Sequence, residues 1–274
     1  LTDVTGVQTC ALPISRIMFA VWTAFASSNA LVAAPRHALL TEVLADHVRN
    51  GLVDYRALKN DGRLTKYLDR IASTDPAGLP SEKDRLAFWI NVYNSHTLKL
   101  IADNYPVKSI SDLHYGGSLT LATAMRRTVW HTHRFTVGGR VLTLDAVEHA
   151  ILRPVFGDYR IHAAIVCAAM SCPPLRSEAY EGDAIDRQLD EQMRLFLANR
   201  SLNRYDASIR TLHLSRIFSW FEKDFTGGRG DLVEVLLPHL PAETADALKG
   251  REREVRIRYL PYDWRLNERP GDQR

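Results

Sequence analysis

Residues 86–101 read LAFWINVYNSHTLKLI, and this stretch decides how the rest of the chain is interpreted. Its apolar residues recur at helical spacing and further apolar residues lie on the opposite side, so it predicts a helix that is buried on more than one side. Ser81 and Asp84 precede it as a Ser-x-x-Asp helix start. Asn91 and Asn94 lie near its apolar boundary, where a buried amide must find hydrogen-bond partners or cost about 1–3 kcal/mol.

The composition is that of an ordinary globular protein. The chain has 274 residues, of which 46% are hydrophobic and 24% charged, and its formal net charge is +3. This near-balance gives no reason to expect a nucleic-acid or membrane-surface partner. No internal repeat or low-complexity linker divides the chain, so we expect one folded domain.

The first 34 residues are interpreted separately from the folded domain. Residues 4–14, VTGVQTCALPI, look like the translation of a sequencing adapter, and residues 1–15 are therefore read as artefactual. Residues 16–34 combine one arginine, an apolar run and small residues at the end, which is typical of a truncated signal peptide. The alternative, an uncleaved anchor, needs about 20 apolar residues without a polar break. We expect a domain at 35–274 that is exported, periplasmic or extracellular, without a stable membrane span after signal removal.

Shorter patterns predict the remaining elements and the fold class. Helices are expected at residues 37–50, 64–72, 145–153 and 183–199, strands at 160–169, 211–214 and 255–259, and a hairpin turn at Gly138-Gly139. The apolar run at 160–169, RIHAAIVCAA, has the length and composition of a central strand. We therefore expect an α+β or α/β domain with a central, mostly antiparallel or mixed sheet packed by several helices.

Cys167 and Cys172 are the cysteines of the expected domain. In a strand, successive side chains alternate, so His162 and Cys167 would lie on opposite faces and a base for Cys167 would come from His149. A reactive thiol is one interpretation. The other is an inert thiol or a local disulfide, which requires the two Cα atoms to lie within about 7 Å.

Glu148 falls in the middle of the apolar face of the helix expected at 145–153. A buried carboxylate needs a partner, which would be His162, an arginine such as Arg153 or Arg160, or a helix N-terminus. The residue is therefore either part of a structural ion pair or a site carboxylate with a shifted pKa.

Metal, cofactor and nucleic-acid sites are not indicated. His131 and His133 would share a strand face, as in a two-histidine half-site, but no third ligand accompanies them. The common phosphate-, dinucleotide-, serine-hydrolase and zinc-protease motifs are missing from the sequence. Glutamates interleave with the arginines of residues 251–258. We expect no cofactor, no metal and no nucleic-acid partner.

Seven segments, taken in order, resemble the family called domain of unknown function 547, of the bacterial exported type. They are VDYRAL (53–58), AFWINVYNSHTLKLI (87–101), NYPVKSI (104–110), LTLDAVEHAILRP (142–154), RIHAAIVCAAMSCPPL (160–175), SRIFSWFEKDF (215–225) and YDWRLN (262–267). The resemblance spans nearly the whole expected domain. It implies that the hallmark positions fall on Trp89, Asn91, Tyr93, Asn94, Glu148, His149, His162, Cys167 and residues 172–174.

These polar groups suggest one pocket between the buried helix, the Glu-His helix and the central strand. The expected catalytic residues are Cys167, His149, His162 and Glu148, and the expected binding residues are Asn91, Asn94, Trp89, Tyr93 and Arg153. One hypothesis is a thiol-dependent hydrolase or acyl-transfer enzyme acting on an amide or peptide-like substrate. The alternative is a non-catalytic envelope binding domain whose polar network fixes the core. A thiol–disulfide role ranks last because CAAMSC is not a Cys-x-x-Cys motif. The partner would be an unknown small molecule or peptide.

Overall fold

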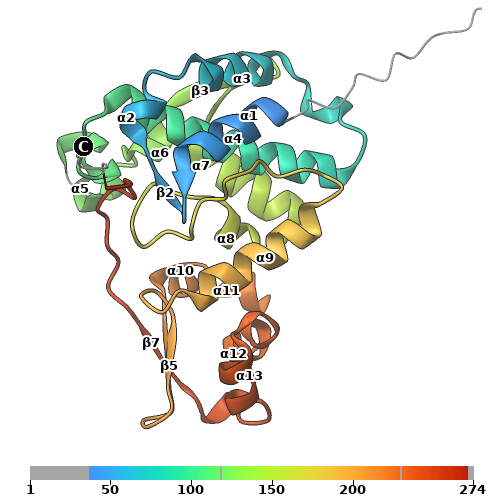
Figure 1. Ribbon diagram of the computed structural model, residues 1–274, viewed down its shortest axis with the longest axis vertical. Helices are drawn as coiled ribbons and strands as arrows, with labels where there is room; N and C mark the ends of the chain where they lie inside the picture. The colour runs from blue at the N-terminus through green and yellow to red at the C-terminus, as the bar shows by residue number, and fades with distance from the viewer. Residues whose placement is uncertain (1–36, 118, 229, 271–274) are drawn as a thin grey trace, which may run out of the picture. The chain divides into compact units, whose positions relative to one another are not determined.

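The computed structural model describes residues 37–117, 119–228 and 230–270, which form a single α+β domain (Figure 1). The predicted class is therefore confirmed. Buried apolar side chains form a larger cluster around the central helix and a smaller cluster in the C-terminal part of the domain. The adapter-like segment and the expected signal peptide lie outside the described residues.

The predicted buried helix is α4 (Glu82–Asn104) (Figure 1). It begins as expected, because the Ser81 hydroxyl accepts the backbone N–H of Asp84 at 3.0 Å. Every residue from Leu86 to Leu98 is buried, so the helix is enclosed on all sides. It contacts α2 (Tyr55–Leu58), α3 (Gly62–Ser73), α9 (Ile185–Ala198) and the segment that carries Glu148.

The strands of the described residues form three small sheets rather than the expected central sheet. Two are antiparallel hairpins, and the third has the order β5-β6-β7 with one antiparallel and one parallel pairing. The strands are β1 (Val48–Arg49), β2 (Leu52–Val53), β3 (Arg134–Val137), β4 (Arg140–Thr143), β5 (Arg204–Asp206), β6 (Thr211–Leu214) and β7 (Arg256–Tyr259). The predicted turn at Gly138-Gly139 joins β3 to β4. A Cβ on Gly138 would lie 2.8 Å from the carbonyl oxygen of Thr74, so this turn requires glycine.

The helix predicted at 145–153 is longer than expected. It starts as α7 (Leu144–Ala146) and continues as the π-helix η4 (Val147–Phe156), which ends at Gly157 with φ +61°. Pro154 lies inside η4 and does not end it. π-helical turns are rare and occur frequently at functional sites, and this one carries Glu148 and His149.

The prediction of a central strand at residues 160–169 is wrong. Residues Ile161–Ala164 form the short helix α8, and the chain becomes extended only at Ile165. An apolar run of this length does not distinguish a buried helix from a buried strand, and here Asp158 starts the helical turn by accepting the Arg160 N–H at 2.9 Å. His162 and Cys167 therefore do not share a strand, and strand alternation no longer decides how they are placed.

The remaining helices complete the two apolar clusters. The smaller cluster includes residues of α9, β6 and the helices that follow it. The other helical elements are α1 (Ala38–His47), η1 (Pro76–Gly78), η2 (Ile110–Leu113), η3 (Tyr115–Gly117), α5 (Leu119–Ala124), α6 (Val129–Thr132), α10 (Arg216–Trp220), α11 (Glu222–Thr226), α12 (Leu232–Leu236), η5 (Leu237–His239), α13 (Ala242–Leu248) and η6 (Glu252–Glu254). Within the described residues, no helix has the length and apolar character that a membrane span requires.

Candidate functional site

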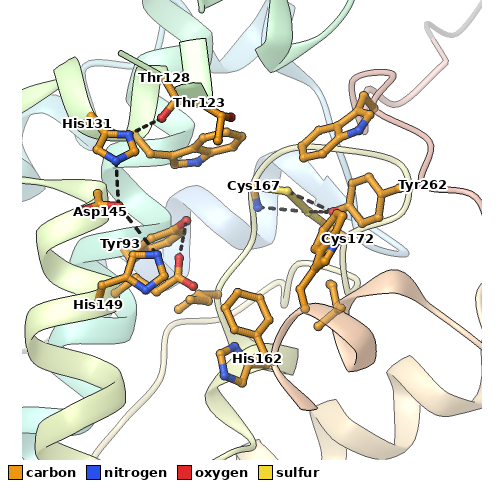
Figure 2. Close-up of a pocket in the computed structure, with 17 residues that line it drawn as sticks. Tyr93, Thr123, Thr128, His131, Asp145, His149, His162, Cys167, Cys172 and Tyr262 are labelled. Atoms are coloured by element: carbon orange, nitrogen blue, oxygen red, sulfur yellow. Dashed lines mark hydrogen bonds and ion pairs between the residues drawn. A yellow bond between two sulfur atoms is a disulfide. The ribbon is translucent and has the colours of Figure 1, made fainter. Parts of the chain in front are cut away.

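A cavity of about 250 Å³ lies against α4, η4 and the segment after α8 (Figure 2). Aromatic rings and ionisable groups share its wall. The wall consists of Tyr93, Thr123, Thr128, Trp130, His131, Asp145, Glu148, His149, His162, Ile165, Cys167, Cys172, Ile217, Trp220, Phe221, Tyr262 and Trp264. All four residues expected to be catalytic line this cavity, together with Tyr93 from the expected binding set.

Glu148 is the most strongly perturbed acid of the wall. Its carboxylate accepts the Tyr93 O–H at 3.3 Å, and the Tyr93 pKa is raised by burial, so the phenol is protonated. Burial raises the pKa of Glu148 to about 7, although the nearby charge of Arg153 and the bond from Tyr93 lower it. Near neutral pH the group can therefore both donate and accept a proton, as a general acid or base must.

Asp145 lies between two histidines of the wall (Figure 2). Its carboxylate oxygen Oδ1 is 3.3 Å from Nε2 of His131 and 3.7 Å from Nε2 of His149. Nδ1 of His149 accepts a hydrogen bond from Arg153 at 2.7 Å, so the proton of the neutral ring is on Nε2. Burial lowers the pKa of His149, and both of its nitrogens face other groups. His149 is thus oriented within the site but is not a free base for Cys167.

A second network holds His162. Its Nε2 lies 2.8 Å from Asp224, and its ring stacks on Phe221 with centroids 3.9 Å apart. Arg153 donates two hydrogen bonds, of 2.6 and 2.9 Å, to the same carboxylate. Burial lowers the pKa of His162 to about 4, so the ring is neutral at pH 7. Of the partners expected for Glu148, Arg153 contributes its charge, whereas His162 bonds to Asp224.

Cys167 and Cys172 are joined by a disulfide, with their Cα atoms 6.4 Å apart. Both sulfurs lie 3.2 Å from the hydroxyl oxygen of Tyr262 (Figure 2). Within the described residues, the side-chain hydrogen bond of the Cys167 sulfur is made with Tyr262, and none is made with a histidine. With this bond intact, Cys167 has no thiolate to act as a nucleophile.

The remaining expected binding residues lie outside the cavity. Asn91 exchanges two hydrogen bonds with the backbone of Tyr180, at 2.8 and 2.9 Å. Asn94 donates to the carbonyl of Ala164 at 2.9 Å and accepts the N–H of Val166 at 3.0 Å. Both buried amides thus have hydrogen-bond partners in the backbone, as the sequence predicted. Trp89 is buried and packs edge-on against the neighbouring Phe88.

Several site residues were not identified from the sequence as site residues. They are Asp145, Asp224, Trp220, Phe221, Tyr262 and Trp264, and His131 was weighed only as a metal ligand. The sequence did hold a signal for the first six of these residues, because each of them lies in a segment that carries the family resemblance. His131 and His133 separate, since His131 faces Asp145 whereas His133 lies beside Phe135. Among the described residues, no group of three side chains is arranged to hold a metal ion.

The fold and the site together define an α+β protein with a small, aromatic-walled pocket that contains an acid of raised pKa. The model of the family described as "Protein of unknown function, DUF547" matches residues 77–197, so this segment of the chain is similar to that family. The match contains α4, η4 and both cysteines but ends before Asp224 and Tyr262. No curated protein matches the chain, and no solved structure does.

Proposed function

We propose that the protein is a hydrolase of small ester or amide substrates in which Glu148 is the general base that activates water. The observation that carries the proposal is the Glu148 carboxyl group, which has a pKa of about 7 in the wall of a small cavity. A general base works best when its pKa lies near the operating pH. A cavity of about 250 Å³ suits a small molecule or one side chain of a larger substrate.

In this mechanism the ionised Glu148 takes a proton from water as the water attacks the substrate carbonyl carbon. The protonated carboxyl group then returns the proton to the departing alcohol or amine. Tyr93 holds the carboxylate through its 3.3 Å hydrogen bond. Asp145 and its two histidines form a polar part of the wall, which can orient the polar end of the substrate.

The thiol-dependent route requires a reduced protein, because the disulfide occupies the sulfur of Cys167. The water-dependent route works with the disulfide intact, so we favour it. We further propose that the protein acts outside the cytoplasm, as residues 16–34 suggest. A disulfide supports this location, because such bonds persist mainly in oxidising compartments.

The test is a panel of p-nitrophenyl esters and p-nitroanilides with acyl groups from acetyl to phenylacetyl, assayed without reductant between about pH 5.5 and 9. We expect hydrolysis to increase with pH through about 7, as Glu148 ionises. Glu148→Gln should lower the rate by 10²-fold or more, whereas Glu42→Gln, on exposed α1 surface, should not. A Cys167→Ser/Cys172→Ser variant should retain activity. A Glu148→Gln rate within about twofold of the wild-type rate would overturn the proposal.

The second candidate is a binding domain without catalysis. The network of Arg153, Asp224 and His162 favours it, because these groups satisfy one another and leave the aromatic wall as the main contact surface. Tryptophan fluorescence can follow binding of the carboxylic acids that correspond to the panel. Binding of these acids without hydrolysis of any panel member would support this candidate.

A further inference from the structure

The Cys167–Cys172 disulfide lies where the larger apolar cluster meets the cavity: both cysteines line the cavity wall, Cys172 belongs to the cluster, and Cys167 packs against it. Cys167 is half-buried, whereas Cys172 is only 5% exposed. We propose that this bond is an exchange-active redox centre, at which low-molecular-weight thiols that enter the cavity reduce the protein. This activity goes beyond hydrolysis and does not depend on it.

The loop between the cysteines is held by contacts other than the disulfide. Residues 168–171 are hydrogen-bonded to the segment 263–267. The Met170 N–H donates to the Arg265 carbonyl at 2.8 Å, and the Asp263 N–H donates to the Ser171 hydroxyl at 2.9 Å. Because these bonds do not involve sulfur, the loop can keep its place when the disulfide opens. A disulfide whose only role was to hold this loop in place would duplicate what these hydrogen bonds already do.

The surroundings of the two sulfurs favour one direction of attack. Cys167 is the more exposed of the two residues, so its sulfur is the one that an incoming thiolate would reach first. The departing sulfur would then be that of Cys172, which accepts the Cys167 N–H at 3.1 Å. The Tyr262 hydroxyl lies 3.2 Å from the same sulfur, and burial raises the pKa of Tyr262, so it is a protonated donor. Two donors stabilise a thiolate, and a more stable leaving thiolate accelerates exchange.

The complete reaction balances with two molecules of the thiol. The first thiolate bonds to Sγ of Cys167, and the electron pair of the S–S bond leaves with Sγ of Cys172. The second thiolate attacks the sulfur of the bound small molecule and releases Cys167. The small thiols are oxidised to their disulfide, and the protein is reduced to two thiols. The two protons released by the small thiols are taken up by the cysteines.

The experiment uses the full chain, purified without reductant and treated in native buffer with 2-mercaptoethanol. Samples are quenched with N-ethylmaleimide, and peptide mapping follows Cys167 and Cys172 separately from Cys10. We expect complete reduction without denaturant. Tyr262→Phe should slow it about tenfold, because the leaving thiolate loses a hydrogen bond to a charged group.

Tyr259→Phe is the matched control, since Tyr259 is a half-buried tyrosine of β7 outside the cavity wall. Two single-cysteine variants test the direction of attack: with 2-hydroxyethyl disulfide, Cys172→Ser should form the mixed disulfide at Cys167 at least about tenfold faster than Cys167→Ser forms it at Cys172. Thermal melts verify that each variant is folded.

Three results would overturn the proposal: reduction only in denaturant, equal reduction rates for the two tyrosine variants, or faster capture at Cys172. Each is read from sulfur chemistry alone. Failure of the proposed hydrolysis is instead read from the Glu148→Gln comparison, so the two failures are distinguishable.

Discussion

Replacing Glu148 with glutamine should stabilise the protein in alkaline solution. Burial raises the pKa of this carboxyl group from 4.5 to about 7 in the folded state. The folded state therefore binds the proton more tightly than the unfolded state, and stability falls as the pH rises between these two values. At about 1.4 kcal/mol per pKa unit, the ionised group costs the folded protein about 3 kcal/mol above pH 7. Glutamine keeps an oxygen for the Tyr93 hydroxyl and carries no charge.

Urea unfolding of the wild type and Glu148→Gln, between about pH 4.5 and 8.5, measures this difference. We expect nearly equal free energies of unfolding at the acid end and an advantage of up to about 3 kcal/mol for the variant at the alkaline end. Glu42→Gln, at an exposed position of α1, shows how much of the pH dependence follows from removing any carboxylate. A free-energy difference between wild type and Glu148→Gln that does not change with pH would refute the reasoning, because the pKa of Glu148 would then be the same in both states.

Three further predictions concern the groups that support the site. Asn94→Asp should lower the free energy of unfolding by about 2–3 kcal/mol in urea, because a carboxylate then faces a buried carbonyl that loses its donor, whereas Asn60→Asp at an exposed position should have little effect. Arg153→Ala should lower the free energy of unfolding by about 2 kcal/mol in the same assay, since the partly buried carboxylate of Asp224 loses the two hydrogen bonds that Arg153 donates. Cys167→Ser/Cys172→Ser should cost at most about 2 kcal/mol, because the closed loop is short and is held by other bonds, and a larger loss would show that the disulfide maintains the fold.

The sequence predicted best where local chemistry and burial agree. The start signal at Ser81 and the apolar pattern after it identified α4, and the paired glycines identified the β3–β4 turn. The position of Glu148 on an apolar face predicted an inward carboxylate, which the structure confirms. In each case the deciding information lies within a few residues of the element itself.

The prediction failed where a distant contact decides the outcome. The apolar pattern of residues 160–169 fits a buried helix and a buried strand equally well, and the packing of α8 against α9 is a contact that this pattern does not reveal. Likewise, Asp224 reaches His162 from 62 positions further along the chain, and Tyr262 reaches Cys167 from 95 positions away. Hydrophobic periodicity carries no information about such pairings, although the family resemblance included both segments.

The polar residues in the segments that carry the family resemblance differ in which groups can satisfy their hydrogen bonds. An amide has both a donor and an acceptor, so Asn91 and Asn94 are satisfied by pairing with backbone groups in the core. A carboxylate offers only acceptors and a charge, so it can accept from backbone N–H groups but leaves backbone carbonyls without a donor, and its charge makes burial costly. Glu148 therefore sits at a cavity wall with one phenol as its hydrogen-bond partner, and the unfavourable burial appears as a raised pKa. Reactivity is accordingly expected of the ionisable member of the set, and the asparagines are expected to hold the backbone that positions it.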